Sequence, residues 1–140
     1  MNKNNTAIAD FILLALAVFI AVGTAFLFRA CDAKEDGSFM SCHWAEHVVT
    51  GLGCVMTVIS AAHLGAKTPR MKIGISIALL PVEIYTALVP GIIIKLCMMN
   101  TMRCHTMMRP CVTVICAIMV MVTVADIFIW NKKEVINNDK

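Results

Sequence analysis

The sequence predicts an all-α integral membrane protein, a four-helix bundle built as two tandem transmembrane hairpins. Three observations lead to this fold class. Apolar residues make up 59% of the 140 residues, whereas charged residues make up 15%, against about 25% in soluble domains. The mean hydropathy is +0.80. Four apolar runs each reach the ~20 residues that a helix needs to cross a hydrocarbon core of ~30 Å, and lipid offers no partner to an open backbone.

The predicted spans cover residues 7–28, 45–65, 73–97 and 111–130, within a single four-span domain of residues 1–140. The first apolar run exceeds the h-region of a signal peptide, and no small-x-small cleavage site follows it, so we interpret it as a span. Pro81 and Pro90 lie in the third run, where we expect them to kink the helix. The polar tail 131–140 is expected to be frayed.

Lysine and arginine counts predict the orientation in the cell membrane. With both termini in the cytoplasm, seven basic residues lie on the inner side and five on the outer side, as the positive-inside rule favours. The inner set is Lys3, Lys67, Arg70, Lys72, Lys132, Lys133 and Lys140, and the outer set is Arg29, Lys34, Lys95, Arg103 and Arg109. The net charge of +3, without a dense basic cluster, argues against a nucleic-acid partner and leaves the lipid bilayer as the expected environment.

A Met-x-Cys-His phrase occurs twice, 62 positions apart, at Met40 to His43 and at Met102 to His105. Each phrase precedes a long apolar run. Because two membrane crossings separate them, both phrases are expected on the same face, which is the outer face in the predicted orientation. The chain therefore reads as two helical hairpins related by an axis along the membrane normal.

Four cysteines are expected at this outer face, and an even number on an oxidising surface favours two disulfides. They are Cys31, Cys42, Cys97 and Cys104. Three connectivities stay open, of which Cys31–Cys42 and Cys97–Cys104 would close short loops within each hairpin. The other cysteines, Cys54, Cys111 and Cys116, fall in or near spans, where cysteine usually behaves as a small apolar residue.

The same face could instead hold a soft metal, a haem or a redox thiol pair. Thiolates and thioethers select copper(I) or zinc, and imidazole binds zinc, copper or the iron of haem b. The candidate ligands are Met40, Cys42, His43, Met102, Cys104 and His105. Residues 43–47 also match the inverted zinc-protease signature H-x-x-E-H, but the chain lacks a soluble catalytic domain. We therefore expect a protein that is not an enzyme.

Glu83 is an acid near the middle of the third span. An ionised carboxylate there costs about 2.5–3.5 kcal/mol, so it should be protonated, face the bundle or find a partner. We expect a proton relay, a polar contact to a partner helix, or a structural hydrogen bond of the neutral acid to Thr57, Ser60 or Thr123. His63 and Asp126, near the inner ends of their spans, are interpreted as interfacial residues.

The sequence also resembles a small bacterial four-span membrane family that is catalogued as a domain of unknown function. The resemblance extends from about Leu14 to Val124 and rests on both phrases and their surroundings, namely residues 41–45, Gly51, Cys97, residues 102–106, Arg109 and Pro110. Members of that family often occur beside ABC transporters with MacB-type permeases. The resemblance thus implies an accessory or interaction subunit that docks an ABC-type transporter or a second copy of itself, with the metal, haem or thiol-redox site as the alternative.

Overall fold

Four long helices form one bundle in the computed structural model, which describes residues 3–27, 41–95 and 104–138. They are α1 (Lys3–Val22), α2 (Ser41–Gly65), α3 (Pro69–Leu88) and α4 (Arg109–Asn138), with π-helical turns at Gly23–Leu27 (η1) and Cys104–Met108 (η2). Each is long and apolar enough to cross a membrane, over Ile8–Leu27, Ser41–Gly65, Pro69–Leu88 and His105–Lys132. The predicted all-α membrane bundle is confirmed.

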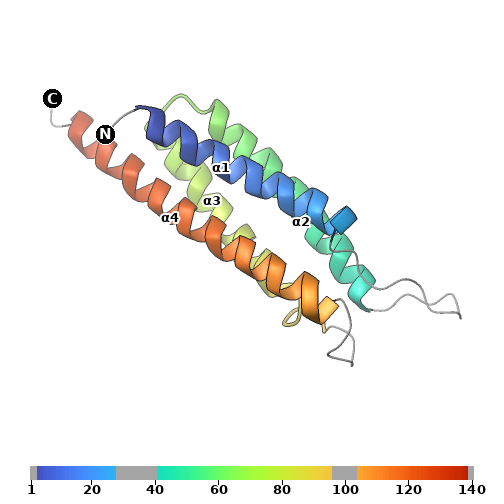
Figure 1. Cartoon of the computed structure of the whole chain (residues 1–140). Coiled ribbons are helices and arrows are strands. Elements are labelled where there is room, and N and C mark those ends of the chain that lie inside the picture. The colour runs from blue at the N-terminus through green and yellow to red at the C-terminus, as the bar shows by residue number, and fades with distance from the viewer. Residues whose placement is uncertain (1–2, 28–40, 96–103, 139–140) are drawn as a thin grey trace, which may run out of the picture.

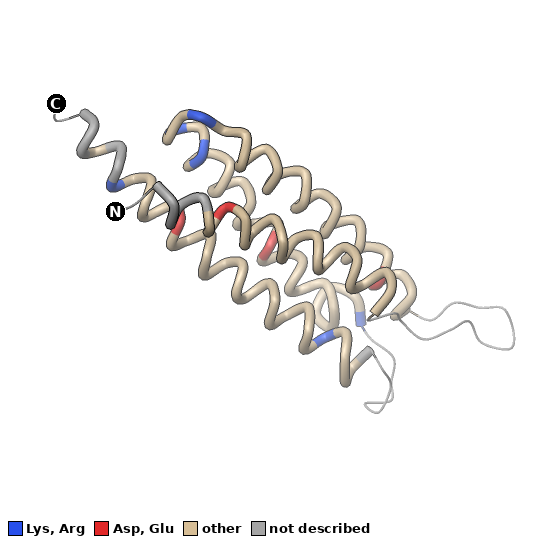
Figure 2. Tube along the Cα trace, turned by 45° about the horizontal axis from the view of Figure 1, so that its top comes forward, with Lys and Arg blue, Asp and Glu red and all other residues tan. Residues whose placement is uncertain are grey.

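The helices run antiparallel in chain order, so both termini lie at one end of the bundle (Figure 1). We call this the terminal end, and the opposite end, where α1 finishes and α2 begins, the loop end. The packing is closest between α1 and α2 and between α3 and α4, which are the two predicted hairpins. A hairpin boundary therefore falls at the short turn between α2 and α3, where basic side chains gather (Figure 2).

The predicted third span is wrong at its end, because α3 stops at Leu88 instead of continuing to residue 97. Pro81 is accommodated inside the helix. Val89 is still helical and its amide donates to the Tyr85 carbonyl, but Pro90 has no amide hydrogen with which to continue the series. The chain then folds back, with the Gly91 amide donating to the Ile94 carbonyl at 3.1 Å. Gly91 has φ +107°, a conformation that glycine adopts without strain.

The fourth helix is longer than predicted at both ends. The helical segment begins with η2 at Cys104, before the expected residue 111, and α4 continues to Asn138. The expectation of a frayed tail from residue 131 is therefore wrong for most of that tail. The Arg109 side chain at the start of α4 lies against the turn after α3, since a Cβ placed on Gly91 would be 3.1 Å from its Nε atom.

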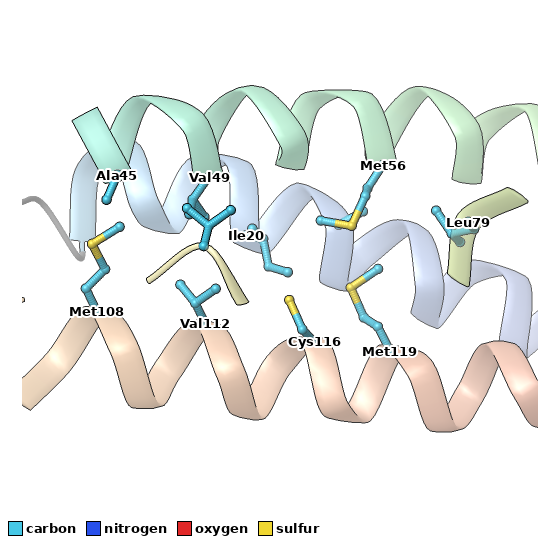
Figure 3. Close-up of a cluster of buried hydrophobic side chains, with 11 residues drawn as sticks. Ile20, Ala45, Val49, Met56, Leu79, Met108, Val112, Cys116 and Met119 are labelled. Carbon is cyan, nitrogen blue, oxygen red and sulfur yellow. The ribbon is translucent and has the colours of Figure 1, made fainter. Parts of the chain in front are cut away.

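The interior of the bundle is divided by chemistry along its axis. Toward the loop end it is mostly apolar, with buried Thr24 and Thr86 bonded to carbonyls of their own helical segments. Figure 3 shows side chains of α4 directed at those of α2 in this region. The cluster comprises Ala17, Ile20, Ala45, Val49, Met56, Leu79, Val89, Met108, Val112, Cys116 and Met119. Toward the terminal end the buried side chains are mostly polar or charged. The molecule therefore has an apolar half and a polar half.

Candidate functional site in the polar half

Charged side chains from all four helices meet inside the polar half. Asp10 comes from α1, His63 from α2, Lys72 and Ser76 from α3, and Asp126 from α4. Their exposed fractions lie between 0 and 8%. We call these five residues the charged cluster. Its members repeat the spacing of the apolar core positions of their helices, and the interior faces of the helices therefore bring them together.

His63 lies between the two aspartates. Its Nδ1 atom is 3.3 Å from Asp10 Oδ1, and its Nε2 atom is 3.1 Å from Asp126 Oδ2. Although His63 Nδ1 and Asp10 Oδ1 are close enough for an ion pair, neither atom makes a well-aligned hydrogen bond. The imidazole therefore joins α2 to both α1 and α4, more tightly on the α4 side.

Ser76 indicates where the protons of this cluster lie. Its hydroxyl donates to Asp126 Oδ2 at 3.3 Å, while its oxygen is 3.0 Å from His63 Nε2. Since Nε2 then faces acceptor oxygens, it must carry a hydrogen. A neutral imidazole would consequently turn the Nδ1 lone pair toward the Asp10 carboxylate, whereas an imidazolium donates on both sides. The geometry thus favours a protonated His63.

Lys72 and Trp130 make the remaining contacts of the two aspartates. The Lys72 ammonium donates to Asp10 Oδ2 and lies 4.8 Å from the centroid of the Trp130 ring, within cation–π range. The Trp130 indole donates to Asp126 Oδ1 at 3.0 Å. With His63 protonated, two cations balance two carboxylates, and the buried cluster is electrically neutral.

The expectation that His63 and Asp126 are interfacial residues is therefore wrong, since both are buried and bound to each other. Hydropathy along one chain shows how deep a residue lies but not which way it faces. The sequence nonetheless indicated the direction of His63, because it continues the three- and four-residue spacing of Gly53, Met56 and Ser60 along one face of α2. A histidine on that face points into the bundle.

Glu83 lies deeper, at the boundary between the two halves. It is fully buried, and Thr123 of α4 donates to its Oε1 atom at 2.8 Å. Thr123 is one of the three hydroxyls expected as partners, so the hydrogen bond across the bundle is present. The other oxygen, Oε2, is buried without a hydrogen bond, as is the hydroxyl of Ser60 on α2.

The described parts of the two Met-x-Cys-His phrases, residues 41–43 and 104–105, lie at the starts of α2 and η2, both at the loop end. Three of their candidate side chains are described. Cys42 is buried and disulfide-bonded, and His43 and His105 are half-buried. Met40 and Met102, the side chain of Cys104, and the other disulfide candidates Cys31 and Cys97 lie outside the described residues. The pairing, and any ligand shared by the two phrases, stay predictions.

His43 and His47 stand one turn apart on α2, with their Nε2 atoms 3.1 Å apart. Two imidazoles supply two metal ligands, and Cys42 cannot act as a thiolate while it is oxidised. Among the described side chains, a group of three potential ligands occurs instead in the charged cluster. The ligand atoms of Asp10, His63 and Asp126 lie within 4.8 Å of one another. The Lys72 ammonium already neutralises Asp10 there, which disfavours a further cation.

Among the comparisons with known proteins, a family model matches most of the chain. No curated protein and no solved structure matches it significantly. Residues 13–129 match the family described as "Domain of unknown function (DUF4418)". This range holds His63, Lys72, Ser76, Glu83, Thr123 and Asp126, whereas Asp10 precedes it. The chain therefore belongs to the DUF4418 family.

Proposed function

We propose that this is a non-enzymatic integral membrane protein whose helix packing responds to a proton on the charged cluster. The observation that carries the proposal is His63, whose two ring nitrogens face buried carboxylates from two different helices. An imidazole is the side chain whose charge changes most readily near neutral pH. Its protonation would therefore be coupled to the packing of α2 against α1 and α4.

The charge balance sets the direction of this coupling. Release of the His63 proton leaves two carboxylates against the single ammonium of Lys72, inside a bundle where an unbalanced charge costs several kcal/mol. The packed state is thus stabilised by the proton, and its stability falls as the pH rises through the range in which His63 loses it. The burial of all five side chains favours a ligand as small as a proton over an organic substrate.

Thermal unfolding in detergent micelles across a pH series tests this function. The wild-type midpoint should fall toward high pH, and His63→Gln should flatten that fall, because its amide carries no titrating proton. His47→Gln, which changes an exposed histidine on the same helix, is the matched control and should retain the wild-type profile. Identical profiles for the wild type and His63→Gln would overturn the proposal. Bound metal that disappears in His63→Gln would assign the cluster to a metal instead.

An accessory role in a membrane transport system is a second candidate, and an apolar groove between α1 and α4 favours it. The groove has a volume of about 410 Å³ and is lined by Phe19, Pro110, Cys111, Val114 and Ile115. We propose that a helix of an ABC-type transporter or of a second copy packs there. Cys111 is a free thiol in the groove, and the exposed free thiol Cys54 lies on α2 outside it.

These two thiols provide a matched test of docking. Bifunctional thiol cross-linking in native membranes should trap a partner through Cys111, and the product should persist in Cys54→Ser but vanish in Cys111→Ser. Mass spectrometry of the product then distinguishes a transporter subunit from a second copy. Equal cross-linking through both cysteines would indicate random collision and would contradict a specific interface.

We also propose that the loop end is the outer face and is stapled by disulfides, with both termini in the cytoplasm. The distribution of basic residues and the oxidised state of Cys42 support this arrangement. An impermeant thiol reagent applied to intact cells should label Cys42 only after reduction. Labelling without reduction, with protection that a chelator removes, would favour the alternative, a copper, zinc or haem site built on Cys42, His43, Cys104 and His105.

A further inference from the structure

Besides the facing His63 Nδ1 and Asp10 Oδ1 atoms, two buried polar atoms of the described residues lack a hydrogen bond in the polar half, on neighbouring helices. They are Glu83 Oε2 on α3 and Ser60 Oγ on α2, and both are shielded from solvent. A buried polar group without a hydrogen bond is costly, so most such groups in proteins are bound by ordered water. Two of them, from antiparallel helices, mark a place where water would be held.

The helix register directs these two atoms toward each other. His63 of α2 contacts Ser76 of α3, so Ser60, about 4.5 Å farther toward the loop end at 1.5 Å per residue, lies between the levels of Ser76 and Glu83. Side chains tilt toward the N-terminus of their own helix. On α2 this tilt points Ser60 toward the loop end, and on α3 it points Glu83 toward the terminal end.

The surroundings allow access to Glu83 from one direction. On the terminal side, buried Leu79 lies one turn from Glu83 on α3, and the charged groups of the cluster, from α1, α2, α3 and α4, lie beyond it. On the loop side stand apolar side chains of the core, among them Met56 and Cys116, whose buried thiol is near Glu83. Thr123 faces Glu83 from α4 and already donates to Oε1. The polar half thus resembles a half-channel that ends at this carboxylate.

We propose that Glu83 is a proton-binding site that exchanges with the terminal side of the membrane through water held between Ser60 and Glu83 Oε2. The proton arrives from bulk water at the terminal end, passes the charged cluster and the Ser60 hydroxyl, and binds the free carboxylate oxygen to give the neutral acid. Release reverses the same steps. This inference rests on the proposed function, because the charged cluster forms the entrance of the proton route, and it adds Glu83 as the site at which the proton binds.

A lipophilic carbodiimide tests the site, because it modifies a protonated carboxylic acid within a membrane and leaves a stable adduct. Dicyclohexylcarbodiimide added to the full-length protein in lipid vesicles should modify Glu83, as located by mass spectrometry, with modification declining as the pH is raised. Glu83→Gln should lose the adduct. Absence of an adduct at any pH at which the protein stays folded would overturn the proposal.

The route is tested separately with Ser60. Ser60→Val should slow hydrogen–deuterium exchange of the Glu83 acid, followed by the shift of its infrared carbonyl band, several-fold. Thr86→Val is the matched control: this threonine is also buried, but its hydroxyl bonds to the Val82 carbonyl of its own helix, beyond Glu83. Equal exchange rates in the wild type and Ser60→Val would overturn the route.

The sidedness is tested in oriented vesicles. A pH step on the terminal side should move the carbonyl band of Glu83, whereas a step on the loop side should leave it unchanged, and the reverse result would refute the half-channel. These readouts report on Glu83 alone. A failure of the charged cluster would instead appear in the pH profile of His63→Gln, so the two failures are distinguishable.

Discussion

The two halves of the bundle interior are built from the same helices but are held together in different ways. In the apolar half, side chains interdigitate without specific partners, as in the packing of Met108 and Val112 against Ala45 and Val49 (Figure 3). In the polar half, each charged group is placed by named partners on other helices. In a bilayer, helices gain little from hiding apolar surface, so close packing and polar bonds both carry the association. The apolar half therefore tolerates exchange of side chains of similar shape, whereas the polar half requires a balanced set of charges.

The largest expected effect comes from unbalancing the polar half. Asp126→Ala leaves the His63 imidazolium and the Trp130 indole without their acceptor, and a buried ion pair broken on one side typically costs about 3–5 kcal/mol. We expect the free energy of unfolding in mixed detergent micelles to fall by that amount. Asp126→Asn keeps an acceptor oxygen and should cost less. Equal, small losses in both variants would show that the pair contributes little.

In the apolar half, a cavity should have the next largest effect. Leu79→Ala removes a side chain that is 1% exposed, and truncations of this kind cost about 2–5 kcal/mol. Ile77→Ala on the same helix changes a side chain that is 56% exposed and should cost much less. The same unfolding measurement gives both values. If the two variants lost equal stability, the packing described for the apolar half would be wrong.

Close contact between α1 and α2 can be tested at a glycine. A Cβ on Gly53 would lie 2.9 Å from the backbone of Ala21, so Gly53→Ala forces the helices apart and should cost about 1–3 kcal/mol. Gly51→Ala is the control, because nothing lies within 4 Å of its added Cβ and alanine favours a helix. A thermal shift that is negative for Gly53→Ala and neutral or positive for Gly51→Ala is the expected result.

The smallest effect is expected at the boundary of the two halves. Thr123→Val removes the hydroxyl that donates to Glu83, and hydrogen bonds between membrane helices contribute about 0.6 kcal/mol on average. Thr113→Val, which removes an exposed hydroxyl bonded to its own helix, should change the unfolding free energy less. A double-mutant cycle with Glu83→Gln measures the coupling, and a coupling of zero would contradict the bond across the bundle.

The sequence predicted the fold because membrane spans are defined by length and composition, and neither depends on the neighbours of a residue. The end of α3 could not be predicted in the same way, since Pro81 and Pro90 look alike in an apolar run, and only the fold-back at Gly91 separates a proline inside a helix from one that ends it. The hydrogen-bond partner of Glu83 could be predicted from the sequence, because few hydroxyl side chains occur at its depth in the membrane.

The charged cluster was missed for a different physical reason. Near the ends of spans, charges are tolerated at the membrane–water boundary, so the depth of His63 and Asp126 left their direction open. The spacing of a residue along its helix fixes the face on which it lies. Whether the four faces meet inside the bundle depends on the rotation of each helix about its axis. That rotation is set by packing contacts such as Gly53 against Ala21.

The bond between Asp10 and Lys72 also has a consequence for biosynthesis, because its partners are 62 residues apart in the chain. At the ribosomal rate of about 5–20 residues per second, Lys72 follows Asp10 after about 3–12 s. During that interval α1 carries an unneutralised carboxylate, which the hydrocarbon core disfavours. We therefore expect α1 to remain beside the translocon, or to sit shallow in the membrane, until α3 emerges and draws it into its final depth.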